Sequence, residues 1–237
     1  MGGKSDSSIS VLILARNEAA NLQTLLPEIR DVLVRSGRKF EIVVIDGQSQ
    51  DGTARVAELH GARVLSQRHP GYANALRQGI ATCAGDFVVA LDADYSHRPD
   101  FVESLLLASA DADIVVASRY VAGGSADMSV DRRALSVIIN RVFGFLLRVP
   151  IRDMTSGFRV YRRAALQSLE PRGEHFDALP ELLALAHFAG RLIREIPFHY
   201  HPREAGLSKA NALKFAPAYL RTLLRCWRMK KSRRENG

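Results

Sequence analysis

Two short acidic stretches of the sequence have the residue types needed to bind a metal ion. Asp92 and Asp94 flank Ala93, and the same Asp-Ala-Asp tripeptide recurs at Asp111 and Asp113. Two carboxylates one residue apart can both turn toward one hard divalent cation, Mg²⁺ or Mn²⁺, which leaves coordination positions open for phosphate oxygens. A chain of this length holds on the order of one Asp-x-Asp by chance. The position of each pair in the fold must therefore decide which of the two could bind a metal ion.

Short apolar runs rich in β-branched residues alternate with helical patterns, which predicts βαβ units and a mostly parallel sheet of the α/β class. The expected strands are Ser10–Ala15, Phe40–Asp46, Ala62–Ser66, Asp86–Asp92 and Asp113–Ser118. The expected helices between them are Ala19–Ser36, Thr53–His60, Tyr72–Thr82 and Pro99–Ser109. Beyond residue 118 the pattern predicts helices near 131–148 and 179–189, a strand within 192–200 and a helix over roughly 211–231.

Only the first Asp-x-Asp lies where a parallel sheet binds ligands. Asp92 and Asp94 follow the carboxyl end of their predicted strand, whereas Asp111 and Asp113 precede the amino end of the next one. Ligands of such sheets bind beyond the carboxyl ends of the strands. The first pair is therefore the predicted metal site, with a solvated strand-to-helix turn as the alternative, and Asp111 is expected in a solvated loop or cap.

Polar segments follow three other strands at this same edge, and here the chain resembles a known family. Six motifs, in their order and spacing, resemble the family 2 glycosyltransferases of the dolichol-phosphate (polyprenol-phosphate) mannose synthase type: DGQSQDGT, HPGYANALRQGI, LDADYSHRPDFV, ASRYVAGG, DMTSGFRVYRR and REAGLSK. The resemblance covers Ser10 to about Lys209. It implies a GT-A type fold, a mostly parallel sheet with flanking helices, that binds a nucleotide-sugar donor.

The resemblance also implies roles for residues on the donor side. Asp92 and Asp94 would hold the metal that clamps the diphosphate, with Ser96 near it. Other positions that would bind the nucleotide sugar are Glu18, Ile45, Asp46, Ala93, Arg119, Arg203 and Lys209. The alternatives are that Glu18 supports the first turn of its helix and that Asp46 caps a glycine-rich turn. Gly47 stands where family members often carry an acid, so a uridine donor remains an alternative to a guanosine one.

On the acceptor side, the resemblance implies that a polyprenyl phosphate is held by basic groups. Arg132 and Ser136, one helical turn apart, match positions that hold the acceptor phosphate. Arg203 and Lys209 match a segment that closes on the phosphates, and with Asp92, Asp94 and Arg119 they form the predicted catalytic set. For Arg119 and Lys209 the alternative is a solvated charge.

The chemistry of a phosphate acceptor needs no general base, because the nucleophile is already an anion at neutral pH. Transfer of a hexose, with mannose from GDP-mannose expected, would then invert the anomeric carbon. A hydroxyl acceptor is the alternative, and it would need Asp153 or Glu181 as an essential base. For Asp153 a structural cap or turn is an equal alternative.

Composition excludes several other classes. The chain has 237 residues, of which 47% are hydrophobic, and its two cysteines, Cys83 and Cys226, are far apart, which argues against a disulfide scaffold or a zinc site. No GxxxxGK loop follows the first strand, which argues against a nucleotidyltransferase, and too few aromatics accompany the basic residues for nucleic-acid binding.

Most of the net charge of +8 lies at the carboxyl end, where residues 221–237 carry seven basic side chains and one acidic one. We divide the chain into a catalytic domain, 1–209, and a basic amphipathic helix and tail, 210–237. The expected apolar stripe of this helix is Leu213, Ala216, Leu220, Leu223, Leu224 and Trp227. The pattern is typical of a helix on an anionic membrane surface, so the enzyme is expected to be cytoplasmic and peripheral, with a separate membrane subunit left open. The alternative is that the stripe packs on the domain or on a second subunit.

Overall fold

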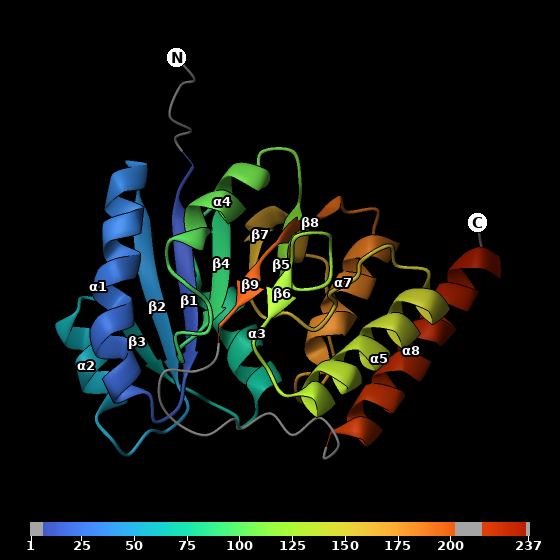
Figure 1. Ribbon diagram of the computed structural model, residues 1–237, viewed down its shortest axis with the longest axis horizontal. Coiled ribbons are helices and arrows are strands. Elements are labelled where there is room, and N and C mark those ends of the chain that lie inside the picture. Colours follow the sequence, from blue (N-terminus) through green and yellow to red (C-terminus); the bar gives the residue numbers. More distant parts are fainter. Residues whose placement is uncertain (1–6, 202–214, 236–237) are drawn as a thin grey trace.

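The computed structural model describes residues 7–201 and 215–235. Helices and strands alternate along the chain and form one layered α/β structure (Figure 1). The strands are β1 Ile9–Ala15, β2 Phe40–Asp46, β3 Arg63–Ser66, β4 Phe87–Asp92, β5 Ile114–Ser118, β6 Ser125–Ala126, β7 Arg159–Arg162, β8 Ile193–Pro197 and β9 His199–Tyr200. The helices are α1 Ala19–Ser36, α2 Thr53–Leu59, α3 Tyr72–Thr82, α4 Phe101–Ala108, α5 Val130–Leu147, α6 Arg163–Leu166, α7 Ala178–Phe188 and α8 Ala216–Glu235.

Seven strands form the central sheet in the order β3-β2-β1-β4-β7-β5-β8. All of its pairings are parallel except those of β7, which runs antiparallel to both β4 and β5. Strands β1, β2, β4 and β5 are continuous buried apolar runs, as expected for strands covered on both faces. The predicted mostly parallel sheet is therefore confirmed.

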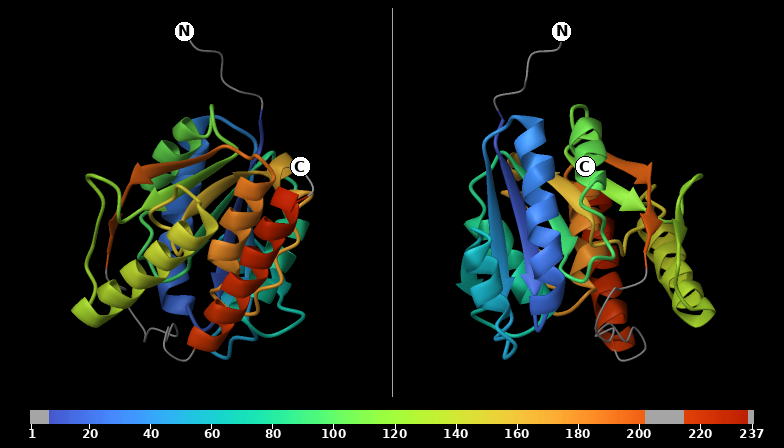
Figure 2. Two further views of the ribbon diagram at one scale, coloured as in Figure 1. Left: turned by 90° about the vertical axis from the view of Figure 1, so that its right-hand side faces the viewer. Right: turned by 60° about the vertical axis from the view of Figure 1, so that its left-hand side comes forward.

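Helices cover both faces of the sheet (Figure 2). Apolar residues of α1, α2 and α4 join one buried cluster, and those of α3, α5, α7 and α8 join another on the opposite face. Helices α1 and α3 lie on opposite faces because the order of the strands reverses between β1 and β4. The chain adds β2 and β3 on one side of β1 and then adds β4 on its other side. Open α/β sheets bind ligands at such a reversal, at the carboxyl ends of the strands.

The strand register brings the ends of β1, β2 and β4 to one level. Ala15 is opposite Asp46 on β2, and Leu14 is opposite Asp92 on β4. The residues that follow these strands therefore share one edge of the sheet, as the sequence predicts.

Strand β7 was not expected from the sequence as an antiparallel strand between two parallel ones. It lies within the TSGFRVY segment and carries Arg159, which is fully buried. The guanidinium of Arg159 donates to the backbone oxygens of Met154 and Leu179 at 2.7 and 3.0 Å. These bonds tie the segment before β7 to the start of α7.

Helix α8 buries a different face from the one that the predicted apolar stripe defines. Its buried residues are Ala218, Tyr219, Thr222, Leu223 and Cys226, and of these Tyr219, Leu223 and Cys226 pack in the cluster shared with α5 and α7. Of the predicted stripe, Leu223 is buried, whereas Ala216, Leu220, Leu224 and Trp227 are exposed and Leu213 lies outside the described residues. Most of the predicted stripe is therefore not used for packing on the domain, and its expected contact with a membrane stays a prediction.

Candidate active site

A cavity of about 710 Å³ lies at the carboxyl ends of β1, β2 and β4, where the strand order reverses. Arg119, after β5, and the start of α8 contribute to its wall. Its lining residues include Glu18, Ile45, Gln67, Tyr72, Asp92, Ala93, Asp94, His97, Arg119, Arg132, Thr155, Phe176 and Tyr200. Segments far apart in the sequence therefore meet at the predicted edge.

Three tight backbone turns follow the strands that end at this cavity. Asn17, Gln48 and Tyr95 follow β1, β2 and β4, and their φ angles are 54°, 60° and 65°. Left-handed backbone is uncommon for residues other than glycine and costs on the order of 1–3 kcal/mol, so such residues need support from their surroundings. Hydrogen bonds hold the first turn, because Asn17 N donates to Ser49 Oγ at 2.8 Å and Asn17 Oδ1 accepts from Gln50 N at 2.9 Å.

Strand β4 brings both predicted carboxylates to the cavity. The side chain of Asp92 is 36% exposed, whereas Asp94 is 2% exposed. Asp94 Oδ1 accepts from the backbone N and the Oγ of Ser96 at 3.1 and 2.5 Å. Asp92 N donates to Nδ1 of His97 at 2.9 Å. The turn from residue 92 to 97 is thus held by its own side chains, which fixes where the Asp94 carboxylate points.

These two carboxylates fit a hard divalent cation. Asp92 and Asp94 offer oxygen ligands, the donors that Mg²⁺ and Mn²⁺ prefer, and the adjoining cavity has room for phosphate oxygens and water to complete the coordination. Ser96 is fully buried behind Asp94, and its hydroxyl already donates to that carboxylate. Ser96 therefore orients the Asp94 carboxylate. Binding of an ion by Asp92, Asp94 or Ser96 stays a prediction.

Arg119 is held by a buried carboxylate. Its Nε and NH2 atoms donate to the two oxygens of Asp153 at 2.7 Å each, and its backbone N also donates to Oδ2 at 2.9 Å. The Arg119 side chain is 11% exposed and that of Asp153 is 0% exposed. Burial would raise the pKa of Asp153, but the charge and hydrogen bonds of Arg119 outweigh burial and lower it. Asp153 therefore fixes a permanent cation at the cavity wall.

A network of hydroxyls extends from Arg119 toward α5. Arg119 NH2 also donates to Thr155 Oγ1 at 2.9 Å, and the hydroxyl of Ser136 lies 3.2 Å from the same atom. Thr155 and Arg132 line the cavity, while Ser136 is partly buried next to Thr155. The predicted acceptor residues Arg132 and Ser136 therefore lie beside Arg119, at the start of α5.

The predicted nucleotide-binding residues are divided between the cavity and its support. Glu18, Ile45 and Ala93 line the cavity, and Glu18 Oε2 accepts from Asn21 Nδ2 at 2.7 Å. Asp46 is buried beside it, where its carboxylate accepts hydrogen bonds from the backbone and hydroxyl of Ser49. In the described structure Asp46 thus supports the loop after β2, which agrees with the alternative that it caps a glycine-rich turn. Its contact with a nucleotide stays a prediction.

Several aromatic residues of the cavity were missed in the sequence. Tyr72 stacks on Phe176 at 4.4 Å, and Tyr200 packs against the ring of His97 at 6.0 Å. His97, which was not among the predicted site residues, is 3% exposed and lines the cavity. Its place five residues after Asp92, within the motif that follows β4, was the available signal.

The remaining predicted residues lie elsewhere. Arg203 and Lys209 are outside the described residues. Asp111 is exposed, and Asp113 is bound to Leu192 N at 2.9 Å, at the amino end of β5 and away from the cavity. Glu181 is 1% exposed and pairs with Arg225 at 2.6 Å. Neither Asp153 nor Glu181 lines the cavity.

Comparison with known proteins agrees with this geometry. Residues 10–170 match the family model described as glycosyl transferase family 2. The chain is 30% identical over 227 residues to a dolichol-phosphate mannosyltransferase of Pyrococcus furiosus, covering 92% of this chain and 63% of that protein. It is 29% identical over 201 residues to a dolichyl-phosphate hexose transferase of Haloferax volcanii, covering 85% of this chain and 86% of that protein. This chain thus spans less than two thirds of the length of the first relative.

Solved structures show the same fold. Glucosyl-3-phosphoglycerate synthase of Mycobacterium tuberculosis, in complex with Mn²⁺, uridine diphosphate and glucosyl-3-phosphoglycerate, superposes with a TM-score of 0.73 at 23% identity, over 94% of this chain and 81% of that one. Mannosyl-3-phosphoglycerate synthase of Rubrobacter xylanophilus superposes with a TM-score of 0.71 at 20% identity, over 95% and 75%. The fold is therefore of the GT-A type. With more than half of its residues matched by the family model, the chain belongs to glycosyltransferase family 2.

Proposed function

We propose that this glycosyltransferase is metal-dependent and inverting, and that it transfers mannose from GDP-mannose to a polyprenyl phosphate. The observation that carries the proposal is the acceptor half of the cavity, where Arg119 and Arg132 lie with the hydroxyls of Thr155 and Tyr200. Among the described lining residues the carboxylates are Glu18, Asp92 and Asp94, which lie after β1 and β4. The acceptor half thus offers cations and hydroxyl groups, which suit an anionic acceptor.

The residues can perform this transfer without a base. A phosphate monoester is already anionic, so the enzyme must mainly align two phosphate groups and screen their repulsion. Arg119 suits the screening of this repulsion, because Asp153 holds its side chain rigidly and the guanidinium needs little reorganisation during the reaction. A cation at Asp92 and Asp94 would neutralise charge on the departing nucleoside diphosphate. Direct displacement at the anomeric carbon inverts its configuration.

A hydroxyl acceptor is the less favoured alternative. It requires a general base within hydrogen-bond reach of the acceptor. The two carboxylates suggested for that task, Asp153 and Glu181, are buried in pairs with Arg119 and Arg225 and do not line the cavity. The names of the two relatives from Pyrococcus furiosus and Haloferax volcanii, which act on dolichyl phosphates, also support a phosphate acceptor.

The donor base is the more open part of the proposal. A Cβ atom at Gly47 would lie 3.2 Å from Gln67 Oε1 and 3.3 Å from Ala15 O. The acid that family members often carry there would therefore be crowded by Gln67, which itself lines the cavity. A uridine donor stays the alternative, and donors must be compared directly.

We expect Arg132→Ala to raise KM for a short polyprenyl phosphate by about tenfold while KM for the nucleotide sugar changes little, because one charge-assisted contact to phosphate is worth roughly 1.5–3 kcal/mol. The enzyme is first incubated with the short polyprenyl phosphate and a panel of GDP- and UDP-sugars, and the products are identified by mass. KM for the acceptor is then measured with the donor that reacts. Arg133→Ala is the matched control, since Arg133 is an exposed neighbour that does not line the cavity. Equal KM values for both variants, or a product formed only with hydroxyl acceptors, would reject the proposed acceptor.

The proposal includes contact with a membrane through α5 and α8. Both helices begin at the cavity, and they pack side by side as they leave it (Figure 1). Their exposed large apolar side chains are Val130, Ile138, Val142, Phe145 and Leu146 on α5 and Leu220, Leu224, Trp227 and Met229 on α8. No helix in the described ranges has the length and apolar character needed to cross a membrane. An apolar face of this kind, beside basic groups, suits the headgroup boundary of an anionic bilayer.

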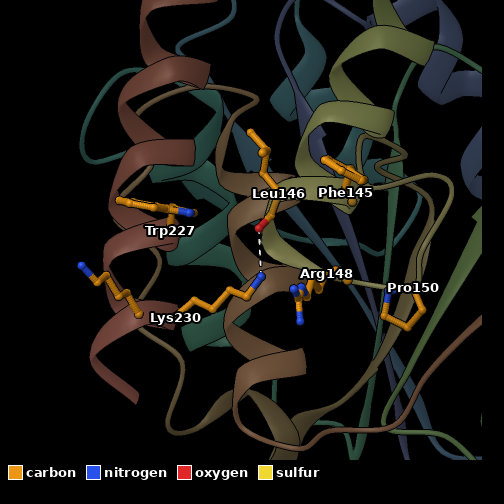
Figure 3. Close-up of a pocket in the computed structure, with 9 residues that line it drawn as sticks. Phe145, Leu146, Arg148, Pro150, Trp227 and Lys230 are labelled. Carbon is orange, nitrogen blue, oxygen red and sulfur yellow. Dashed lines mark hydrogen bonds between the residues drawn. The ribbon is translucent and has the colours of Figure 1, made fainter. Parts of the chain in front are cut away.

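A second cavity, of about 660 Å³, lies where the two helices end. Figure 3 shows Trp227 and Phe145 on either side of Leu146, with Lys230 donating to the backbone oxygen of Leu146 at 2.9 Å. Arg148 and Lys231 also line this cavity. Apolar and basic side chains thus alternate at the ends of both helices, and each basic residue near an anionic surface adds about 1 kcal/mol.

We expect Leu224→Ser combined with Trp227→Ser to weaken binding to anionic liposomes by about tenfold or more, because both side chains are roughly half-exposed and would lose apolar contact with lipid. Cosedimentation at several salt concentrations measures this. Leu59→Ser, an exposed leucine on α2, is the matched control. Turnover of a water-soluble short-chain acceptor should persist in the double variant. If the double variant binds liposomes as strongly as the unchanged protein, this face does not bind the membrane.

A further inference from the structure

The small ribbon of β6 and β9 brings together three side chains that can bind a metal ion, outside the cavity. Its parallel register pairs Ser125 with His199, and Asp127 N donates to Tyr200 O at 2.9 Å one position further on. Successive residues of a strand point to opposite faces. Tyr200 lines the catalytic cavity, so His199 and His201 share the face that points away from it.

The side chains on this outer face are close enough to share one ion. His199 Nε2 lies 3.0 Å from Asp127 Oδ2, and the two imidazole rings are 4.5 Å apart. One ligand atom from each of Asp127, His199 and His201 can be chosen so that all three lie within 4.8 Å of one another. Ligand atoms about 2.0–2.2 Å from a zinc ion are separated by roughly 3–3.5 Å, so modest rotations of partly exposed side chains would close the set.

A fourth residue orients the site. Ser125 Oγ lies 2.5 Å from His199 Nδ1. Metal-binding histidines use one ring nitrogen for the ion and the other for a hydrogen bond that fixes the ring and its tautomer. With Nδ1 bonded to Ser125, Nε2 is left for the ion. An exposed Asp127–His199 pair alone would contribute little stability and would not explain why His201 joins it.

We propose that Asp127, His199 and His201 form a second metal site, for a divalent transition ion such as Zn²⁺, separate from the Asp92–Asp94 site. Two imidazoles and one carboxylate suit Zn²⁺, whereas the oxygen ligands of Asp92 and Asp94 suit Mg²⁺ or Mn²⁺. The ion would tie β6 to β9 and so hold the strand whose other face presents Tyr200 to the cavity. This proposal does not depend on the donor or the acceptor.

The second metal site can be tested by titrating tag-free, metal-stripped protein with Zn²⁺ and measuring the binding by calorimetry. The unchanged chain and Asp94→Asn should each show this site. His199→Ala and His201→Ala should each lose it, and Ser125→Ala should weaken it by about tenfold, as is typical when a residue that orients a ligand is removed. His60→Ala, at the end of α2 on another part of the surface, is the histidine control and should bind as the unchanged chain does.

A second readout uses Co²⁺, whose visible absorption reports imidazole ligands. The spectrum should appear with the unchanged chain and disappear in the His199→Ala, His201→Ala double variant. Equal Zn²⁺ binding by the double variant and the unchanged chain would overturn the proposal, as would loss of the site in Asp94→Asn. Circular dichroism of each variant shows whether its fold is kept, which is expected because the three side chains are at least partly exposed.

Discussion

Replacing Asp94 with asparagine is expected to lower kcat by a factor of about 10²–10³, and Asp92→Asn should have an effect of similar size. Both carboxylates line the cavity at the end of β4, where they would hold the cation that neutralises the departing diphosphate. Asparagine keeps the shape of the side chain but removes the charge. Single-turnover assays across a range of Mn²⁺ and Mg²⁺ concentrations measure the loss, and chelation of the ion should abolish activity of the unchanged enzyme.

The second Asp-x-Asp supplies the matched controls. Asp111 is exposed and Asp113 bonds to Leu192 N at the opposite end of the sheet. Asp111→Asn and Asp113→Asn should leave kcat unchanged. A loss of kcat in these variants comparable to that of Asp94→Asn would mean that the strand-end argument for the metal site is wrong.

Asp153→Asn is expected to lower the free energy of unfolding by about 3–5 kcal/mol at neutral pH, because it leaves the Arg119 guanidinium largely buried without a counter-charge. It should also lower kcat, since Arg119 would lose the two contacts that fix its direction. Urea denaturation and steady-state kinetics measure the two effects. The partly exposed pair of Arg162 and Asp113, 3.9 Å apart, is the control, and Asp113→Asn should cost about 0–1 kcal/mol.

The same pair predicts a pH dependence of stability. The pKa of Asp153 is lowered in the folded protein from its ordinary value of 3.8, because Arg119 outweighs the effect of burial. A carboxyl with a lowered folded-state pKa stabilises the protein fully above its unfolded value and loses that contribution as the pH falls through the folded value. The stability difference between the unchanged chain and Asp153→Asn should therefore be constant above about pH 5 and shrink below pH 3.8. A difference that grows on acidification would contradict this assignment.

The sequence by itself determined the parallel core of the sheet and the edge where ligands bind. Short apolar runs such as those ending at Ala15, Asp46 and Asp92 are typical of strands that are covered by helices on both faces of a sheet. The helical periodicity between these runs predicts that helices connect neighbouring parallel strands. Because the carboxyl ends of such strands share one edge, the place of Asp92 relative to its strand separated it from Asp111. That step uses only local pattern and chain direction, which is why it could be made without coordinates.

Only the tertiary structure decided the partners that lie far apart in the sequence. Arg119 and Asp153 are 34 residues apart, and they meet because β7 inserts antiparallel between β4 and β5. His97 and Tyr200 likewise become cavity residues only when β9 passes beside the turn after β4. The buried face of α8 was set by the shapes of α5 and α7, which accept Thr222 and Cys226 while leaving Trp227 outside. Such contacts depend on strand order and on complementary packing between elements, and neither has a local periodicity in the sequence.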